Sequence, residues 1–350
     1  MKRSRAALLI AQSLLGLGLL IGWLLVVDLG EIGRTLSQAR WGLVAMASVM
    51  GLASLSLRAL RWRIVLRPVA RVPYLDIWLV VAASALVNFV IPLRTAEIAR
   101  SLFLRQRRDV PIAASLATAV VDRVFDLAAV LLLGAAGALV MGGLRGGASG
   151  FLIGGGILLT GFAAFVGVTV WARSGQMALI DRLLPRKLGA PLRGQILGII
   201  ERFLDGFAAV WRRPRELAPL FALGIAATLA DAAAFYVLIA SLGFSAAPML
   251  VVLGYSLYSL TYLVPAAPGY VGSAEAFGSL AFAGVGLPPA LAASAVVLSH
   301  AVTSILVLSL GAISLWGLGI HPASTIRSLL GQESAGSGTG PVPPEGKSLG

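Results

Sequence analysis

The sequence predicts an all-α polytopic membrane protein with about six full spans plus two re-entrant helical hairpins in an inverted repeat. Of its 350 residues, 58% are hydrophobic and only 12% are charged. The mean hydropathy is +0.91, well above that of soluble domains. A helix crosses the hydrocarbon core with roughly 20 apolar residues at about 1.5 Å each. Six runs are long enough, near 6–27, 41–57, 112–141, 150–172, 217–242 and 288–318.

Two further apolar stretches, near 75–92 and 246–285, are interrupted by residues that break helices. Pro92 ends the first stretch, and the second contains Pro265, Pro268, Gly269 and Gly272. Non-helical backbone at membrane depth is tolerated only where it is buried in protein or lines a watery cavity. These two stretches are therefore candidates for hairpins that enter the membrane and return.

The basic residues indicate how the first segments cross the membrane. The run 6–27 is too long for the apolar region of a signal peptide, and no cleavage-like site follows it, so we interpret it as a retained anchor. Helix 41–57 then returns, and the five arginines within 58–71 lie on the cytoplasmic side, as the positive-inside rule expects. A complete span at 75–92 would place the next arginines outside. We therefore predict a re-entrant hairpin over 75–104.

The later segments follow the same rule. Helix 112–141 exits, 150–172 returns, and the basic segment 173–215 forms an amphipathic cytoplasmic linker. Helix 217–242 exits again, and the second hairpin enters from the opposite face. Helix 288–318 then brings the chain back to the cytoplasm.

This threading predicts one transmembrane domain over 1–330, followed by a disordered Gly/Ser/Pro-rich tail at 331–350. Its inverted halves are about 41–141 and 217–318, related by an offset of about 177 residues. We expect both termini to be cytoplasmic and the protein to lie in the cell (inner) membrane. Interrupted segments at corresponding positions of two halves point to a substrate site near the midplane.

Charged residues follow the first break at helical spacing. Arg94, Glu97 and Arg100 are three apart, so they share one face of a helix that starts after Pro92. A solvated face beside the membrane is one interpretation. The other is that Arg94, near a half-helix N-terminus, binds an anionic group, because that end carries partial positive charge and free N–H donors.

Three further charges lie inside the predicted span 112–141. Asp122, Arg123 and Asp126 are about 16 Å beyond its start at 1.5 Å per residue, where charges are costly and face an interior partner. An ion pair that joins two helices is one interpretation. Alternatively, Arg123 binds a lipid phosphate while the carboxylates orient its guanidinium.

The second half has its own polar residues. Glu275 is the inverted counterpart of Glu97, and His300 falls where Arg123 falls in the first half. A membrane histidine is either a hydrogen-bonded packing residue or a proton carrier. Asp231 has no partner that the sequence identifies. The Gly-x-x-x-Gly pair Gly18/Gly22 predicts a helix-packing notch.

Composition excludes several site classes. The chain has no cysteine and only two histidines, so we expect neither a thiolate nor a histidine metal site. The net charge of +13 follows membrane topology, so we expect no nucleic-acid partner. We also expect no cofactor, and the sequence has no ATP-binding motif.

The motifs "PLRTAEIAR" at 92–100, "VVDRVFD" at 120–126 and "PAAPGYVGSAE" at 265–275 carry a family resemblance. Over about residues 6–318 the chain resembles the flippase-like membrane family typified by the transmembrane region of lysylphosphatidylglycerol synthetase. The family pattern has Gly where this chain has Ala96, and Glu where it has Asp122. The resemblance implies translocation of lipid headgroups. We expect no enzymatic activity, because only 32 residues follow 318 and the soluble aminoacyl-transferase domain of bifunctional members is not among them.

These observations favour a lipid flippase or transporter for an anionic phospholipid or a polyprenyl-phosphate-linked substrate, with a lipid-modifying enzyme as a possible partner. An ion-coupled transporter of small solutes, a membrane-embedded polyprenyl-lipid glycosyltransferase and an accessory subunit are the alternatives. We expect the substrate to contact Arg94, Glu97, Arg100, Asp122, Arg123, Asp126, Pro265, Pro268, Gly269, Gly272, Glu275 and His300.

Overall fold

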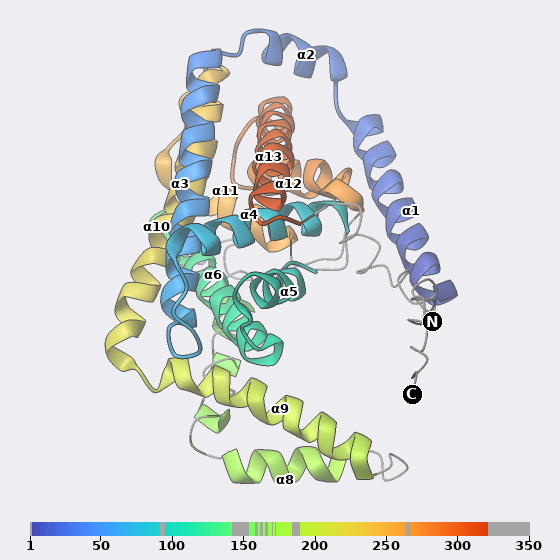
Figure 1. The fold of residues 1–350 in the computed structure, drawn as a ribbon. Helices are drawn as coiled ribbons and strands as arrows, with labels where there is room; N and C mark the ends of the chain where they lie inside the picture. The colour runs from blue at the N-terminus through green and yellow to red at the C-terminus, as the bar shows by residue number, and fades with distance from the viewer. Residues whose placement is uncertain are drawn as a thin grey trace, which may run out of the picture.

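The computed structural model describes residues 2–91, 95–141, 190–262 and 267–320, together with parts of 154–183. Every regular element in these ranges is helical (Figure 1). The predicted tail 331–350 and most of the predicted span 150–172 lie outside the described residues.

The chain begins with two helices that meet at a sharp bend. Helix α1 (Lys2–Val26) and helix α2 (Leu29–Ser37) make an angle of 86°. The Asp28 side chain accepts hydrogen bonds from the backbone N–H groups of Gly30 and Glu31 at 2.8 and 3.0 Å, which caps the start of α2. Figure 1 shows α2 connecting the peripheral α1 to the body of the protein.

The next four helices are α3 (Trp41–Leu66), α4 (Tyr74–Val90), α5 (Ala96–Arg108) and α6 (Ile112–Val140). The short helices α4 and α5 pack against each other as a hairpin. Asp76 in the first turn of α4 forms ion pairs with Arg107 and Arg108 in the last turn of α5. The hairpin therefore starts and ends at the same level of the molecule.

The same order of long, short, short and long helices occurs again. The second group consists of α10 (Pro214–Ser241), α11 (Pro248–Thr261), α12 (Ser273–Gly284) and α13 (Pro289–Gly317), with the short 3₁₀ helix η1 (Pro268–Tyr270) between α11 and α12. As α4 packs on α5, so α11 packs on α12.

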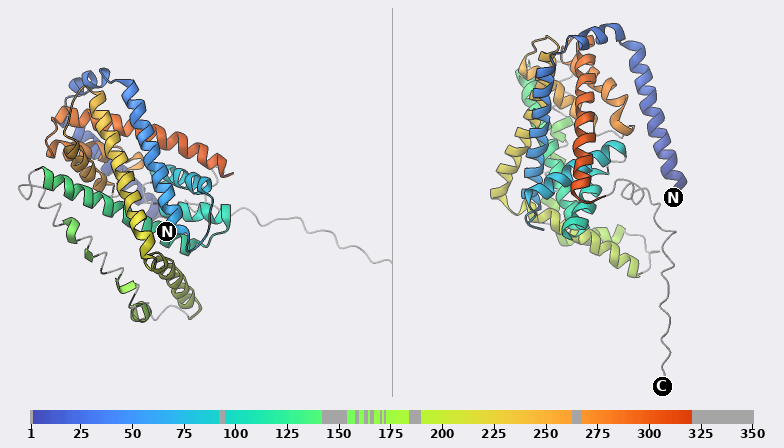
Figure 2. Two further views of the ribbon diagram at one scale, coloured as in Figure 1. Left: turned by 90° about the vertical axis from the view of Figure 1, so that its left-hand side faces the viewer. Right: turned by 45° about the horizontal axis from the view of Figure 1, so that its top comes forward.

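The two groups interlock through long-range helix pairs. Helix α3 packs along α10, α4 packs against α13, and α11 packs against α6. The left view in Figure 2 shows α3 and α10 side by side. One buried apolar cluster surrounds Trp62, Phe103 and Phe125 in the first group, and another surrounds Phe235 and Phe282 in the second.

The apolar helices are those of a membrane protein. Among the described residues, α3, α6, α10 and α13 are long and apolar enough to cross a membrane, and the bent pair α1 and α2 adds a fifth crossing if it forms one span. The predicted end of the second span at residue 57 is wrong, because α3 continues to Leu66. Arg58 and Arg61 are therefore inside a helix.

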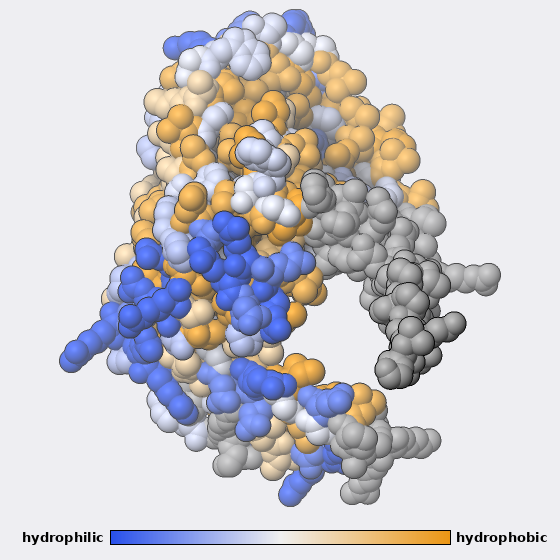
Figure 3. All heavy atoms as spheres, in the orientation of Figure 1, coloured by the Kyte–Doolittle hydropathy of each residue, from blue (hydrophilic) through white to orange (hydrophobic). Residues whose placement is uncertain are grey.

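The region before α10 contains α8 (Arg173–Leu183) and α9 (Ala190–Trp211). Near its C-terminus, α9 buries Phe207 and Val210 and packs against α6, whereas Ile199 is exposed. Figure 3 shows hydrophobic residues over the upper body and hydrophilic residues gathered in its lower half. This separation of apolar and charged surface is typical of a protein that lies in a membrane.

Candidate functional site

The centre of the candidate site is a buried ion triplet. The Nε atom of Arg61 on α3 donates to Asp122 on α6 at 2.7 Å, and Arg100 on α5 donates to the other carboxylate oxygen of Asp122 at 3.0 Å. Arg61 is 0% exposed and the Asp122 side chain is 1% exposed. Buried charges require such pairing because each loses its hydration.

A second set of pairs links the triplet to the other helix group. Arg58 on α3 lies between Asp126 on α6 and Asp231 on α10, at 2.6 and 2.7 Å. Arg61 also contacts Asp126 at 2.9 Å. The hydroxyl of Tyr255 on α11 donates to Asp231 at 2.9 Å, so this carboxylate is held from two helices.

Arg123 is the accessible member of the cluster. Its Nε atom donates to Glu97 on α5 at 2.5 Å, and its Nη1 atom lies 3.5 Å from Asp126. The Arg123 side chain is 43% exposed. A guanidinium that is oriented by two carboxylates and still reaches the surface can bind an anion.

Helical spacing and one glycine explain why these charges meet. Arg58 and Arg61 are three apart on α3, as are Glu97 and Arg100 on α5, so each pair shares one face of its helix. Gly224 on α10 leaves room for Arg61, because a Cβ atom at this position would lie 3.1 Å from Arg61 Nη1.

Charge is balanced among the described members of the cluster. Four guanidinium groups face four carboxylates, namely Arg58, Arg61, Arg100 and Arg123 against Glu97, Asp122, Asp126 and Asp231. Within the part of the chain that the structure describes, Arg100 Nε and Thr95 Oγ1 are buried without a hydrogen-bond partner. Both groups lie on or just before α5, where the first hairpin turns.

The second hairpin carries a separate polar site. His300 on α13 contacts Glu275 on α12 through Nδ1 and the backbone carbonyl of Gly269 through Nε2, the latter at 2.7 Å. Both partners are hydrogen-bond acceptors. A neutral imidazole has one donor and an imidazolium has two, so the arrangement is complete only when a proton is shared by His300 and Glu275.

The backbone at this second break needs its glycines. Gly269 has φ 69° and Gly272 has φ 83°, and Tyr270 between them has φ 59°. The N–H of Gly272 donates to the second carboxylate oxygen of Glu275 at 2.7 Å, which fixes the start of α12. Left-handed conformations are accessible to glycine at little cost but are strained for tyrosine.

A row of tyrosines lies between the two polar sites. Tyr258 and Tyr262 on α11 are 2.6 Å apart at their hydroxyl oxygens. The rings of Tyr262 and Tyr270 meet edge to face with centroids 4.9 Å apart. Asn88 at the end of α4 donates to the Tyr270 hydroxyl at 2.7 Å, so polar contacts join the two hairpins.

The structure divides the predicted site residues into two groups. Glu97, Arg100, Asp122, Arg123 and Asp126 meet in the ion cluster. Gly269, Gly272, Glu275 and His300 meet at the second break, where Pro268 begins η1. Arg94 and Pro265 lie outside the described residues. Within the described part of the chain, no three His, Cys, Asp or Glu side chains are arranged to hold a metal ion.

Sequence reasoning missed three members of the cluster. The predicted span 41–57 ends before Arg58 and Arg61 and leaves both on the cytoplasmic side, and the sequence identifies no partner for Asp231. Apolar residues continue at helical spacing before, between and beyond these arginines, at Leu57, Leu60 and Ile64. This pattern indicates that the helix continues beyond residue 57 and therefore includes both arginines.

Comparisons with known proteins agree with a lipid-related membrane protein. A family model described as the lysylphosphatidylglycerol synthase TM region matches residues 6–311. The glycosyltransferase AglD of Haloferax volcanii is 25% identical over 335 residues, covering 86% of this chain and 53% of that protein. The chain thus spans about half the length of this relative. No solved structure matches the chain.

The family match extends from the first helix to the last one and includes both hairpins and all residues of the ion cluster. Because it covers most of the sequence, the protein belongs to the family of the lysylphosphatidylglycerol synthase transmembrane region.

Proposed function

We propose that the protein is a translocator that moves the anionic headgroup of a membrane lipid across the cell membrane while the lipid tails stay in the bilayer. The observation that carries this proposal is that Arg123 is partly exposed and belongs to an ion cluster whose centre is buried. Arg123 can pair with a lipid phosphate while Asp126 keeps its guanidinium in place. Exposed Ile98 on α5 supplies apolar surface next to Glu97, as an amphiphilic substrate requires.

The proposal includes an inverted repeat of α3–α6 and α10–α13. At the offset of about 177 residues, the pair α4 and α13 corresponds to α11 and α6, and both pairs are packed. The ion pair of Glu97 with Arg123 corresponds to that of Glu275 with His300. These matching contacts at corresponding positions support an inverted repeat. Such repeats are frequent in transporters.

Charge balance constrains the transport step. The cluster is neutral among its described members, so an entering phosphate adds net negative charge in a region of low dielectric. Uptake of one proton by a carboxylate restores neutrality. Glu97 is suited to this role because it contacts Arg123 directly, so its protonation would release Arg123 to the substrate.

A reconstituted assay tests the role of Arg123. We expect Arg123→Gln to reduce transfer of a fluorescent anionic lipid between the leaflets of proteoliposomes at least about tenfold, since it removes a charge-assisted contact of roughly 1.5–3 kcal/mol. Arg105→Gln is the matched control, because the Arg105 side chain forms an ion pair with the exposed Asp109 on the surface. Equal transfer by both variants and the wild-type protein would rule out Arg123 as the headgroup site.

The name of the Haloferax volcanii relative favours a second candidate function, a glycosyltransferase acting on a lipid-linked acceptor or an accessory subunit of one. That relative is about twice as long as the aligned region, so its activity is not assigned to the matched half. Purified protein incubated with a nucleotide sugar and a polyprenyl phosphate decides between the candidates. Formation of a glycosylated lipid supports the second candidate, and lipid transfer without such a product supports translocation.

A further inference from the structure

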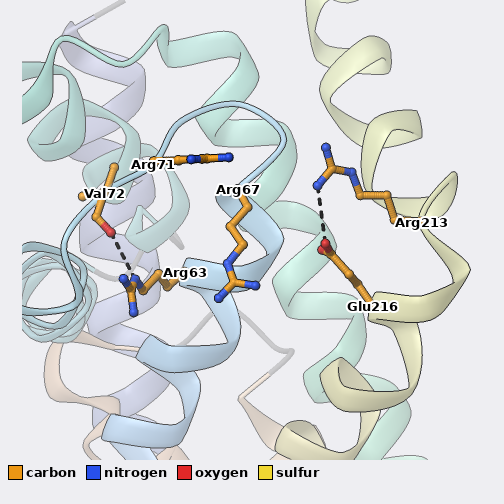
Figure 4. A pocket seen from close by; sticks show the side chains of 6 residues that line it. All are labelled: Arg63, Arg67, Arg71, Val72, Arg213 and Glu216. Carbon is orange, nitrogen blue, oxygen red and sulfur yellow. Dashed lines mark hydrogen bonds and ion pairs between the residues drawn. The ribbon is translucent and has the colours of Figure 1, made fainter.

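A basic cavity lies outside the ion cluster, where α3 ends and α10 begins. Its volume is about 420 Å³, and its lining consists of Arg63, Arg67, Arg71, Val72, Arg213 and Glu216 (Figure 4). Ligand cavities in proteins commonly have volumes of about 300–1,000 Å³. The space is thus large enough for a small polar ligand or a lipid headgroup.

Two of the lining arginines are held by the protein. The Nε atom of Arg63 donates to the backbone carbonyl of Val72 at 3.1 Å. Arg213 forms an ion pair with Glu216 at 3.4 Å. Figure 4 shows these two anchored groups on opposite sides of the cavity.

Arg67 and Arg71 extend into the space between the anchored groups (Figure 4). Both residues are exposed, and neither guanidinium group has a hydrogen-bond or ion-pair partner among the residues of the described ranges. The lining therefore has four guanidinium groups and a single carboxylate. This excess of three positive charges distinguishes the cavity from the ion cluster, in which charges are balanced.

We propose that this cavity binds a diphosphate-type anion. Guanidinium groups donate two parallel hydrogen bonds to phosphate oxygens, and a diphosphate carries enough charge to match the excess of the lining. The positive-inside rule explains basic residues at the membrane surface but not their convergence on one cavity. The diphosphate belongs either to a lipid or to a soluble molecule, and only the lipid source depends on the proposed function.

Binding to the intact protein tests the cavity. The full chain is placed in nanodiscs of phosphatidylcholine, which has no net charge, and inorganic pyrophosphate and inorganic phosphate are titrated at constant ionic strength by calorimetry. We expect pyrophosphate to bind more tightly than phosphate. The double variant Arg67→Gln/Arg71→Gln should raise the Kd for pyrophosphate at least about tenfold.

The double variant Arg212→Gln/Arg215→Gln is the matched control. Both residues are exposed, lie close to Arg213 in the chain and do not line the cavity, so the two double variants remove equal charge. The control should bind pyrophosphate as the wild-type protein does. Equal weakening by both double variants, or no pyrophosphate and no lipid diphosphate binding by the wild-type protein, overturns the proposal.

Farnesyl diphosphate identifies the source of the diphosphate. Tighter binding of farnesyl diphosphate than of pyrophosphate supports a lipid-borne group, whereas equal binding supports a soluble anion. The difference in pyrophosphate Kd caused by Arg67→Gln/Arg71→Gln should persist in an Arg123→Gln background, in which the proposed headgroup site is removed, because Arg123 does not line the cavity. Loss of lipid transfer and loss of anion binding can therefore be separated, so failure of one proposal leaves the other open to its own test.

Discussion

Asp122 is the residue on which the buried part of the ion cluster depends. It accepts from Arg61 and Arg100, and all three side chains are buried. We expect Asp122→Asn to lower the free energy of unfolding by about 3–5 kcal/mol, because it removes the counter-charge of buried Arg100 and one of the two carboxylates that pair with buried Arg61. Thermal unfolding of the detergent-solubilised protein measures this loss.

Asp109→Asn is the control for Asp122→Asn. Asp109 pairs with Arg105 on the surface and its side chain is 87% exposed, so its loss should cost no more than about 1 kcal/mol. Similar unfolding temperatures for the two variants would show that the buried triplet does not stabilise the fold.

His300 satisfies two hydrogen-bond acceptors at the second break. Its ring nitrogens contact Glu275 and the Gly269 carbonyl. We expect His300→Leu to lower the free energy of unfolding by about 1–3 kcal/mol, because both acceptors lose this polar partner. Thermal unfolding measures this loss, and an unchanged unfolding temperature would show that His300 does not stabilise the second break.

At the residue scale, the sequence indicated which charges are important but not all their partners. The spacing of Glu97 and Arg100 predicts that they share one helix face, and the depth of Asp122 in its helix predicts an interior partner; the structure pairs Arg100 with Asp122 and Glu97 with Arg123. The predicted span ends too early, before Arg58, because the positive-inside rule counts arginines near the end of a span without distinguishing those that pair inside the protein. The partner of Asp231 could not be predicted, because it comes from a helix 173 residues earlier.

At the level of elements, α1 contacts the second hairpin through a glycine. A Cβ atom on Gly16 would lie 2.2 Å from the Cβ atom of Ala267, whereas one on Gly18 has no atom within 4 Å. Farther along α1, Trp23 donates to Ser279 on α12 at 3.1 Å. We expect Gly16→Leu to separate α1 from α12, because the larger side chain cannot fit.

A thiol-specific crosslinker between Trp23→Cys and Ser279→Cys measures this contact, since the natural chain has no cysteine. The crosslinked fraction should fall in the Gly16→Leu background and be unchanged in the Gly18→Leu background. An equal yield in both backgrounds would mean that Gly16 does not determine where α1 packs.

The predicted notch at Gly18/Gly22 is wrong for the described chain, because both glycines face open space. The Gly-x-x-x-Gly pattern identifies small residues but not the direction in which they point. By contrast, Pro268, Gly269 and Gly272 correctly predicted an interruption before α12, because ring closure and positive φ act locally. A single sequence shows where proline and glycine constrain the backbone, but it does not show which distant helices pack together.

For the whole molecule, the proposed inverted repeat predicts that the two hairpins open to opposite faces of the membrane. Single cysteines at Arg105, near the end of α5, and at Gly284, the last residue of α12, test this in a chain without native cysteines. We expect a membrane-impermeant maleimide to label Arg105→Cys only from the cytoplasm and Gly284→Cys only from outside. Labelling of both from one face would exclude the inverted arrangement.

The pairing of long helices could not be derived from the sequence. Hydropathy located α3, α6, α10 and α13, but apolar helices of similar composition give no indication of which neighbours they choose. Contact between α3 and α10 brings together segments that are far apart in the chain, and only the folded molecule reveals it.

The guanidinium of Arg58 forms two ion pairs. One is with Asp126 in the same group of helices, α3–α6, and the other is with Asp231 in the second group, α10–α13. Sliding or rotation of α3 against α10 cannot leave this side chain unaffected. The ion pair with Asp231 therefore resists such a movement in addition to the side-chain packing between the two helices.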